Sequence, residues 1–106
     1  MKVKVYLFIT DWATEYDGSD MRVEVCATKK KAQELIREEY NRYKKEYVAR
    51  YGRKNIECNY SKDYAFLQVE GRYDEKHDRW SIEEKEIELT KENIIELWKS
   101  YNLSTG

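Results

Sequence analysis

Side chains that commonly perform acid–base, nucleophilic or metal chemistry are sparse in this sequence, which holds one histidine, His77, and two cysteines, Cys26 and Cys58. A general base needs a partner and a cleft that excludes water. His77 instead stands in the charged segment 74–78, so we expect a solvated turn residue. The three side chains are one short of a usual zinc site, and their spacing fits no zinc knuckle or ribbon. We therefore predict no catalytic residue, no metal site and no cofactor.

Four acids crowd the segment 11–20 and raise the question of a cation site. Carboxylate oxygens are ligands that calcium prefers, but the spacing lacks the twelve-residue EF-hand pattern and its final glutamate. We expect a solvated hairpin loop there, with Asp17-Gly18 as its turn. The glycines, at positions 18, 52, 71 and 106, are also too far apart to cradle a phosphate.

Aromatic residues that alternate with the aliphatic residues of two predicted strands are a first candidate surface. If helices cover the aliphatic face, the sheet normally shows water a polar face on its other side, so aromatics there indicate a binding or self-association surface. The alternative is that a loop or the segment 53–63 covers this face, and both interpretations stay open. The predicted binding surface consists of Tyr6, Phe8, Trp12, Phe66 and Arg72.

A second candidate surface is basic. Lys30, Arg37 and Lys44 recur every seven residues on one flank of a predicted helix, within a segment that holds ten basic residues against four acids in a chain of net charge −1. Basic residues interleaved with aromatics are typical of nucleic-acid binding. The tyrosines have the spacing of a core stripe, however, and glutamates dilute the charge, so a solvated, salt-bridged helix is the favoured interpretation.

The elements that position these residues follow from hydrophobic periodicity. Alternation predicts strands at 2–9 and 21–27, joined as an antiparallel hairpin. Thr28 as N-cap and Gly52 as stop delimit a long amphipathic helix between them. Its apolar stripe consists of Ala32, Ile36, Tyr40, Tyr43, Tyr47 and Tyr51.

The second half of the chain predicts two further strands. The segment 53–63 is left open between strand and loop. Alternation from Ala65 predicts a third strand that can reach Tyr73, and residues 79–89 predict a fourth. We expect a bulge or twist near Glu84–Glu86, because the apolar phase changes there.

Thr90 begins a final predicted helix. The fold class is then α+β, with a four-stranded, mainly antiparallel sheet and two helices on one face in the order ββαββα. Residues 1–106 are expected to form a single domain, because the chain has no proline, no linker and no repeat. The apolar stripe of the final helix is Ile94, Leu97, Trp98 and Tyr101.

The composition also predicts a location. No apolar run approaches the ~18 residues of a membrane span. The first residues alternate charged and apolar side chains, unlike the continuous apolar core of a signal peptide. Two cysteines in 106 residues do not resemble a disulfide scaffold. We expect a cytoplasmic protein that does not enter a membrane.

Residues 62–69, with the sequence KDYAFLQV, resemble the octapeptide of RNA-recognition motifs, in which strand aromatics stack on bases. Asp63 and Val69 replace a glycine and an aromatic residue of that pattern. Val5-Tyr6-Leu7 loosely resembles the companion motif. That family, however, places a helix between its first two strands, which this chain does not.

Over residues 4–89 the chain is similar to small uncharacterised proteins of bacteriophages and mobile elements. The likeness rests on Lys4-Val5-Tyr6-Leu7, on the helix start Thr28 to Leu35, and on Trp80-Ser81-Ile82-Glu83-Glu84. The long helix and the segment 55–61 depart from that group. The resemblance implies a partner-binding role, including inhibition of a host defence complex.

These observations predict a non-enzymatic protein-interaction module that binds a host protein or forms a homodimer. The alternative is a protein that binds RNA or single-stranded DNA with the basic helix and the sheet aromatics.

Overall fold

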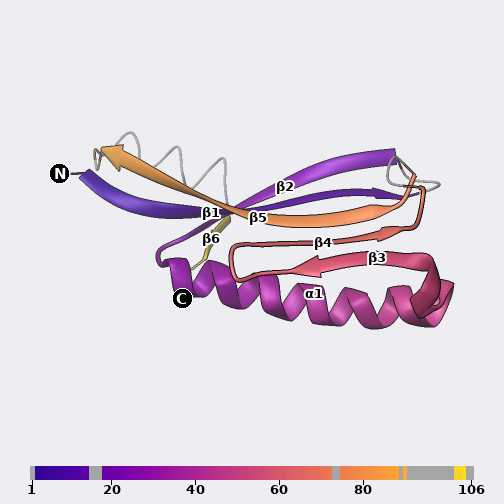
Figure 1. The fold of residues 1–106 in the computed structure, drawn as a ribbon. Helices are drawn as coiled ribbons and strands as arrows, with labels where there is room; N and C mark the ends of the chain where they lie inside the picture. The colour runs from indigo at the N-terminus through magenta and orange to yellow at the C-terminus, as the bar shows by residue number, and fades with distance from the viewer. Residues whose placement is uncertain (1, 15–17, 73–74, 89, 91–101, 105–106) are drawn as a thin grey trace.

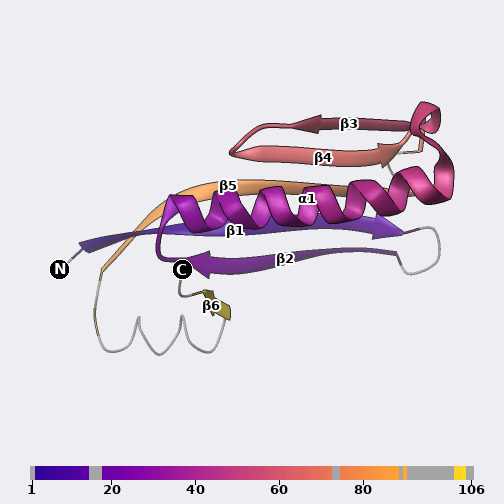
Figure 2. The same cartoon turned by 90° about the horizontal axis from the view of Figure 1, so that it is seen from below.

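The computed structural model describes residues 2–14, 18–72, 75–88, 90 and 102–104. It has one sheet with a long helix along one face (Figures 1 and 2). The strand order is β3-β4-β5-β1-β2-β6, with every neighbouring pair antiparallel except β2 and β6, which are parallel. The elements are β1 (Lys2–Thr14), β2 (Gly18–Cys26), α1 (Lys29–Tyr51), the 3-10 helix η1 (Arg53–Asn55), β3 (Ile56–Tyr60), β4 (Tyr64–Val69), β5 (His77–Glu88) and β6 (Asn102–Ser104).

The prediction of four strands and two helices in the order ββαββα is wrong. The segment 53–63 supplies η1 and the extra strand β3, so the antiparallel part of the sheet has five strands in the order β2-β1-β5-β4-β3. Within the described ranges, α1 is the one α-helix. The helix predicted after Thr90 falls on residues 91–101, which lie outside the described residues.

The hairpin of β1 and β2 is longer than predicted. The segment 11–20 was expected to be a loop, but β1 continues to Thr14 and β2 begins at Gly18, where the two residues pair. Gly18 has a φ of +79°, a conformation that glycine adopts without strain. The strands continue because Ala13 is buried and because Asp11 and Asp20 occupy regular strand positions.

Of the bulge or twist predicted near Glu84–Glu86, the bulge is absent. β1 and β5 stay in one register from Lys2 opposite Glu88 to Ala13 opposite His77. The apolar phase changes because β5 contributes to two separate clusters, one on each face of the sheet. Trp80 belongs to the cluster on the helix side, whereas Ile87 packs with the aliphatic cluster on the other side.

Local signals set the ends of α1, as predicted. The Thr28 hydroxyl accepts a hydrogen bond from the Lys31 N–H at 3.1 Å, and Gly52 at the C-cap has a φ of +85°. The predicted stripe of the helix faces the sheet, with Ile36 and Tyr40 among its buried residues. No helix in the described ranges has both the length and the apolar character of a membrane span.

Candidate functional site

The predicted aromatic surface is divided between the two faces of the sheet. Phe8 is 0% exposed and belongs to the cluster beneath α1, against which Tyr6 packs. Phe66 is half-buried and alternates with Leu67, which belongs to that same cluster, so Phe66 lies on the face away from α1. The expectation that these aromatics share an open face is wrong.

The prediction is wrong because the residues of β1 and β4 that point to the same face are not the ones it assumed. Leu67 pairs with Asp78, and Asp78 pairs with Trp12, so these three residues share a face. This is the face of the even-numbered residues of β1, which the alternation of the sequence predicts to be the open face. The remaining predicted residue, Arg72, lies in the turn before β5, where its guanidinium pairs with Glu75 at 2.8 Å.

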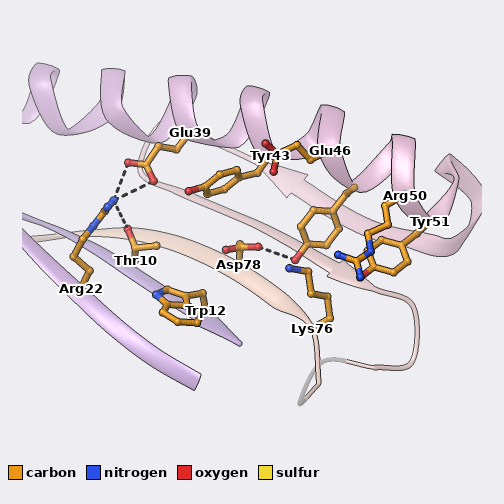
Figure 3. Close-up of a pocket in the computed structure, with 11 residues that line it drawn as sticks. Thr10, Trp12, Arg22, Glu39, Tyr43, Glu46, Arg50, Tyr51, Lys76 and Asp78 are labelled. Atoms are coloured by element: carbon orange, nitrogen blue, oxygen red, sulfur yellow. Dashed lines mark hydrogen bonds and ion pairs between the residues drawn. The ribbon is translucent and has the colours of Figure 1, made fainter. Parts of the chain in front are cut away.

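A polar cleft of about 310 Å³ lies between α1 and the sheet (Figure 3). Helix α1 lines one wall with tyrosines and charged residues, and β1, β2 and β5 line the other. The aromatic lining is Trp12, Tyr43, Tyr47 and Tyr51, and the polar lining is Thr10, Arg22, Glu39, Glu46, Arg50, Lys76 and Asp78.

Glu39 fastens α1 to two strands at one end of the cleft. Arg22 on β2 donates to both carboxylate oxygens of Glu39 at 2.9 and 3.1 Å, and weakly to the Thr10 hydroxyl at 3.4 Å. The indole N–H of the buried Trp80 on β5 donates to the same carboxylate at 3.2 Å. The Glu39 side chain is only 12% exposed, whereas that of Arg22 is 49% exposed, so the bond from Trp80 is the better shielded from water.

Tyr47 and Asp78 form the second link across the cleft. The Tyr47 hydroxyl donates to the Asp78 carboxylate at 2.8 Å. Burial raises the pKa of Asp78, against the opposing effects of the Tyr47 hydrogen bond and the charge of Lys76. Burial, followed by the nearby Asp78 charge, raises the pKa of Tyr47.

Two cations at the same end of the cleft lie on tyrosine rings. The Lys76 ammonium is 5.1 Å from the ring centre of Tyr47, and the Arg50 guanidinium is 5.5 Å from that of Tyr51. The polar groups of the cleft are thus engaged largely with one another. This arrangement is typical of the polar margin of a helix–sheet junction rather than of a reactive site.

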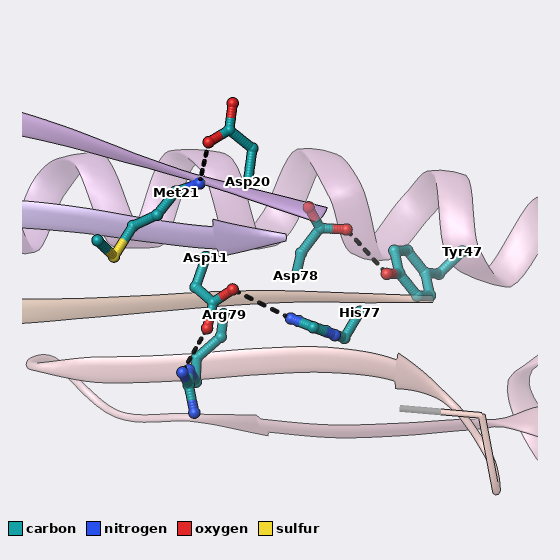
Figure 4. A network of polar contacts seen from close by, with 7 residues as sticks. All are labelled: Asp11, Asp20, Met21, Tyr47, His77, Asp78 and Arg79. Carbon is teal, nitrogen blue, oxygen red and sulfur yellow. Dashed lines mark hydrogen bonds and ion pairs between the residues drawn. The ribbon is translucent and has the colours of Figure 1, made fainter. Parts of the chain in front are cut away.

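On the opposite face of the sheet, Asp11 contacts both His77 and Arg79 (Figure 4). The Nε2 atom of His77 is 3.3 Å from Asp11 Oδ1, and the Arg79 guanidinium donates to the other carboxylate oxygen. His77 is the first residue of β5 and is 6% exposed, so the prediction of a solvated turn residue is wrong. Sequence reasoning missed this cluster because its members are joined only by strand pairing.

The outer edge of β3 offers backbone hydrogen-bonding groups. Two bonds bracket the β3–β4 ladder, from Ser61 N–H to Tyr64 C=O at 2.7 Å and from Glu70 N–H to Asn55 C=O at 2.8 Å. Hydrogen-bonded pairs alternate in an antiparallel ladder, so residues 57 and 59 also bond to β4. The N–H and C=O groups of Ile56, Cys58 and Tyr60 therefore point away from the sheet, and no strand in the described ranges pairs with them.

The predicted basic residues flank this edge. Lys30 and Arg37 line a hollow of about 190 Å³ together with Tyr60 and Lys62. The Lys44 ammonium is 5.7 Å from the ring centre of Tyr40, which in turn lies 5.2 Å from the ring of Tyr60. The structure thus brings Lys30, Arg37 and Lys44 beside β3, and we call this set the basic flank.

Cys58 lies at the middle of the same edge. It is exposed and Cys26 is buried, and neither forms a disulfide. Burial, followed by the hydrogen bond and the electrostatic interaction with Cys58, raises the pKa of Tyr40 to about 12. Among the described residues, no group of three or more histidine, cysteine or acidic side chains is placed to hold a metal ion.

No protein-family model matches the chain, and neither curated proteins nor solved structures gave a significant match. The likeness to phage-encoded proteins therefore stays a prediction. What can be said of function has to come from the geometry of the cleft, the β3 edge and the basic flank.

Proposed function

We propose that the chain is a protein-interaction module whose partner adds an extended segment along the outer edge of β3. The observation that supports this most directly is the outward direction of the backbone groups of Ile56, Cys58 and Tyr60. Main-chain hydrogen bonds provide affinity when a peptide extends an existing sheet, and neighbouring side chains provide specificity. A host protein, as the resemblance to phage proteins implies, is the partner that we have in mind.

Sheet edges that must stay unpaired usually carry proline, lysine or a bulge. In β3 the single charged side chain is Glu57, which accepts a hydrogen bond from Gln68 at 2.9 Å. Glu57 pairs with Gln68 and so lies on the face away from α1. It therefore leaves the edge itself open to a partner strand.

Amide hydrogen exchange tests strand addition at single-residue resolution. Peptides of about ten residues are selected against the protein by display, and exchange is then measured with and without a selected peptide. Strand addition should slow exchange at residues 56, 58 and 60, whose N–H groups point outward. Residues 57 and 59 serve as internal controls, because their N–H groups already bond to β4.

A matched pair of substitutions completes the test. Cys58→Pro removes one outward N–H and should abolish peptide binding, whereas Cys58→Ser keeps that N–H and should bind as the wild type does. Melting curves report whether each variant is folded. If Cys58→Pro does not fold, the alternating exchange pattern in the wild type decides alone. Protection elsewhere in the sheet, without protection at residues 56, 58 and 60, would overturn the proposal.

Nucleic-acid binding is the alternative, and one observation favours it. The basic flank gathers three cations on one side of α1, beside the exposed ring of Tyr60. Recognition of RNA by stacking on the sheet would need Phe8 and Phe66 on one open face, and they lie on opposite faces. The alternative therefore depends on the basic flank alone, and a variant that lacks its three charges should lose all RNA binding.

A further inference from the structure

We infer that the segment bound by β3 is acidic, with carboxylates at alternate positions that face α1. This inference rests on the proposed function and adds the chemistry of the partner. It follows from the directions of the β3 side chains, the charges beside them, and the composition of the other face.

The side chains of a strand added to β3 would alternate between the two faces of the sheet. Ile56, Cys58 and Tyr60 pair with buried residues of β4 and point to the helix side. Residues of the partner strand that stand directly opposite these three would point to the same side. Every second partner side chain would thus lie next to α1.

On that side the partner meets the basic flank. Lys30 and Arg37 reach the hollow beside Tyr60, and Lys44 lies over Tyr40, the ring that contacts Tyr60. No ion pair within 4 Å joins Lys30, Arg37 or Lys44 to any residue of the described ranges. By contrast, Lys29 pairs with Asp63 at 3.5 Å in the neighbouring turn. Glu34 is the one acid that lines the hollow.

The face away from α1 has a different composition. There Glu57 already accepts from Gln68, and Asn59 is neutral. Acidic side chains of the partner on this face would lie near Glu57, which has the same charge, and would form no favourable charge interaction. Alternating acidic and neutral residues therefore match the edge better than a uniformly acidic run.

A second copy of the chain fits the edge poorly. Two β3 strands paired antiparallel about a two-fold axis at Cys58 would form one continuous sheet with both helices on the same face. The two basic flanks would then face each other, and like charges oppose pairing. An acidic segment of another protein meets no such repulsion.

Synthetic peptides separate the charge preference from strand addition. The probes are a labelled nine-residue peptide that alternates glutamate and threonine, and its partner with glutamine in place of glutamate. Affinity is measured by fluorescence anisotropy at about 50 mM and about 500 mM salt. We expect the glutamate peptide to bind about tenfold more tightly at low salt, with most of the advantage lost at high salt.

Two triple variants act as matched tests. Below the concentration at which it dimerises, the variant with Lys30→Gln, Arg37→Gln and Lys44→Gln should lose the preference for glutamate, while hydrogen exchange at residue 58 still slows with either peptide. The control variant removes the same charge from residues of α1 that do not line the hollow beside Tyr60, and it should keep the preference. Its substitutions are Lys31→Gln, Arg42→Gln and Arg50→Gln.

The remaining outcomes are distinct. Equal affinity for both peptides, with protection at residues 56, 58 and 60, would overturn the acidic preference and leave strand addition standing. Binding of the glutamate peptide without that protection would overturn both proposals, as would no binding of either peptide. Tighter binding of single-stranded RNA than of the glutamate peptide, lost in the basic-flank variant, would assign the flank to nucleic acid instead.

Discussion

At the scale of single residues, Asp78 shows how burial and hydrogen bonding compete. Burial raises its pKa more than the Tyr47 hydroxyl and Lys76 lower it. Asp63, at the turn between β3 and β4, shows the opposite balance. A hydrogen bond from Gln33 at 2.7 Å, followed by the charge of Lys29, lowers the pKa of that exposed carboxyl.

The substitution Asp78→Asn tests the direction of the pKa shift of Asp78. A raised pKa in the folded state means that ionised Asp78 opposes folding at neutral pH. This opposition disappears below the unfolded pKa of ~3.9, where both states are protonated. The free energy of unfolding of the variant, relative to wild type, should therefore increase from pH 3 to pH 7. For Asp63→Asn the same difference in the free energy of unfolding should decrease from pH 3 to pH 7. The change should be smaller, because exposed interactions are screened. Urea titrations at each pH give both differences, and a flat Asp78→Asn profile would contradict the assignment.

Substitutions of Phe8 and Phe66 test which face of the sheet each ring occupies. Phe8 is fully buried under α1, so Phe8→Ala should lower the free energy of unfolding by about 3–5 kcal/mol. Phe66 is only half-buried on the other face, and Phe66→Ala should cost less than half as much. Chemical denaturation of the two variants under one set of conditions makes the comparison. Equal losses would mean that both rings are enclosed to a similar degree.

At the scale of elements, the sequence predicted what depends on neighbours along the chain. Thr28 and Gly52 set the ends of α1 through contacts within a few residues, and the periodic stripe chose its buried face. The sequence left β3 open between strand and loop although Ile56 to Tyr60 alternates, because its turn, Lys62-Asp63, lacks the glycine of a usual hairpin. Asp11 and Asp20, which were expected in a loop, are strand residues, because β1 and β2 stay paired as far as Thr14 opposite Gly18.

The candidate site was predictable only in part. The spacing of Lys30, Arg37 and Lys44 placed them on one flank of the helix, but not beside a sheet edge. That position follows from the pairing of β3 with β4, which no local pattern encodes. The sequence predicts Phe8 and Phe66 on one face, but it does not show which residues of β1 and β4 share a face. That relation is set by the pairing of both strands with β5, which lies between them.

Glu39 tests what holds α1 to the sheet. Glu39→Ala removes the acceptor of both Arg22 and the buried Trp80 N–H, so it should lower the free energy of unfolding by about 2–3 kcal/mol. Glu46→Ala is the matched control, because Glu46 is an exposed glutamate on the same wall of the cleft. It should change stability by less than about 0.5 kcal/mol. Thermal and urea unfolding followed by tryptophan fluorescence measure both, and similar losses would mean that Glu39 is not a fastening point.

At the scale of the whole molecule, both faces of the sheet carry a buried cluster. The larger includes Phe8 and Trp80 beneath α1, and the smaller consists of Val5, Leu7 and Val25 with aliphatic neighbours on the other face. Two clusters explain why β1 is apolar in both phases along much of its length. The molecule is elongated, at 50 × 26 × 17 Å, and β3 lies at one edge of the sheet along its length (Figure 2).

The charge on that side predicts the oligomeric state. The wild-type chain, of 12.9 kDa, should be a monomer at about 50 μM and low salt, because pairing of two β3 edges would bring the basic flanks together. Neutralising Lys30, Arg37 and Lys44 removes this repulsion and should allow a dimer that Cys58→Pro abolishes. Light scattering after size exclusion gives the masses.

The control triple variant at Lys31, Arg42 and Arg50 loses the same charge elsewhere and should stay monomeric. A wild-type dimer at low salt that Cys58→Pro converts to monomer would show that the edge is satisfied by a second copy, and that the flank repels too weakly to select an acidic partner.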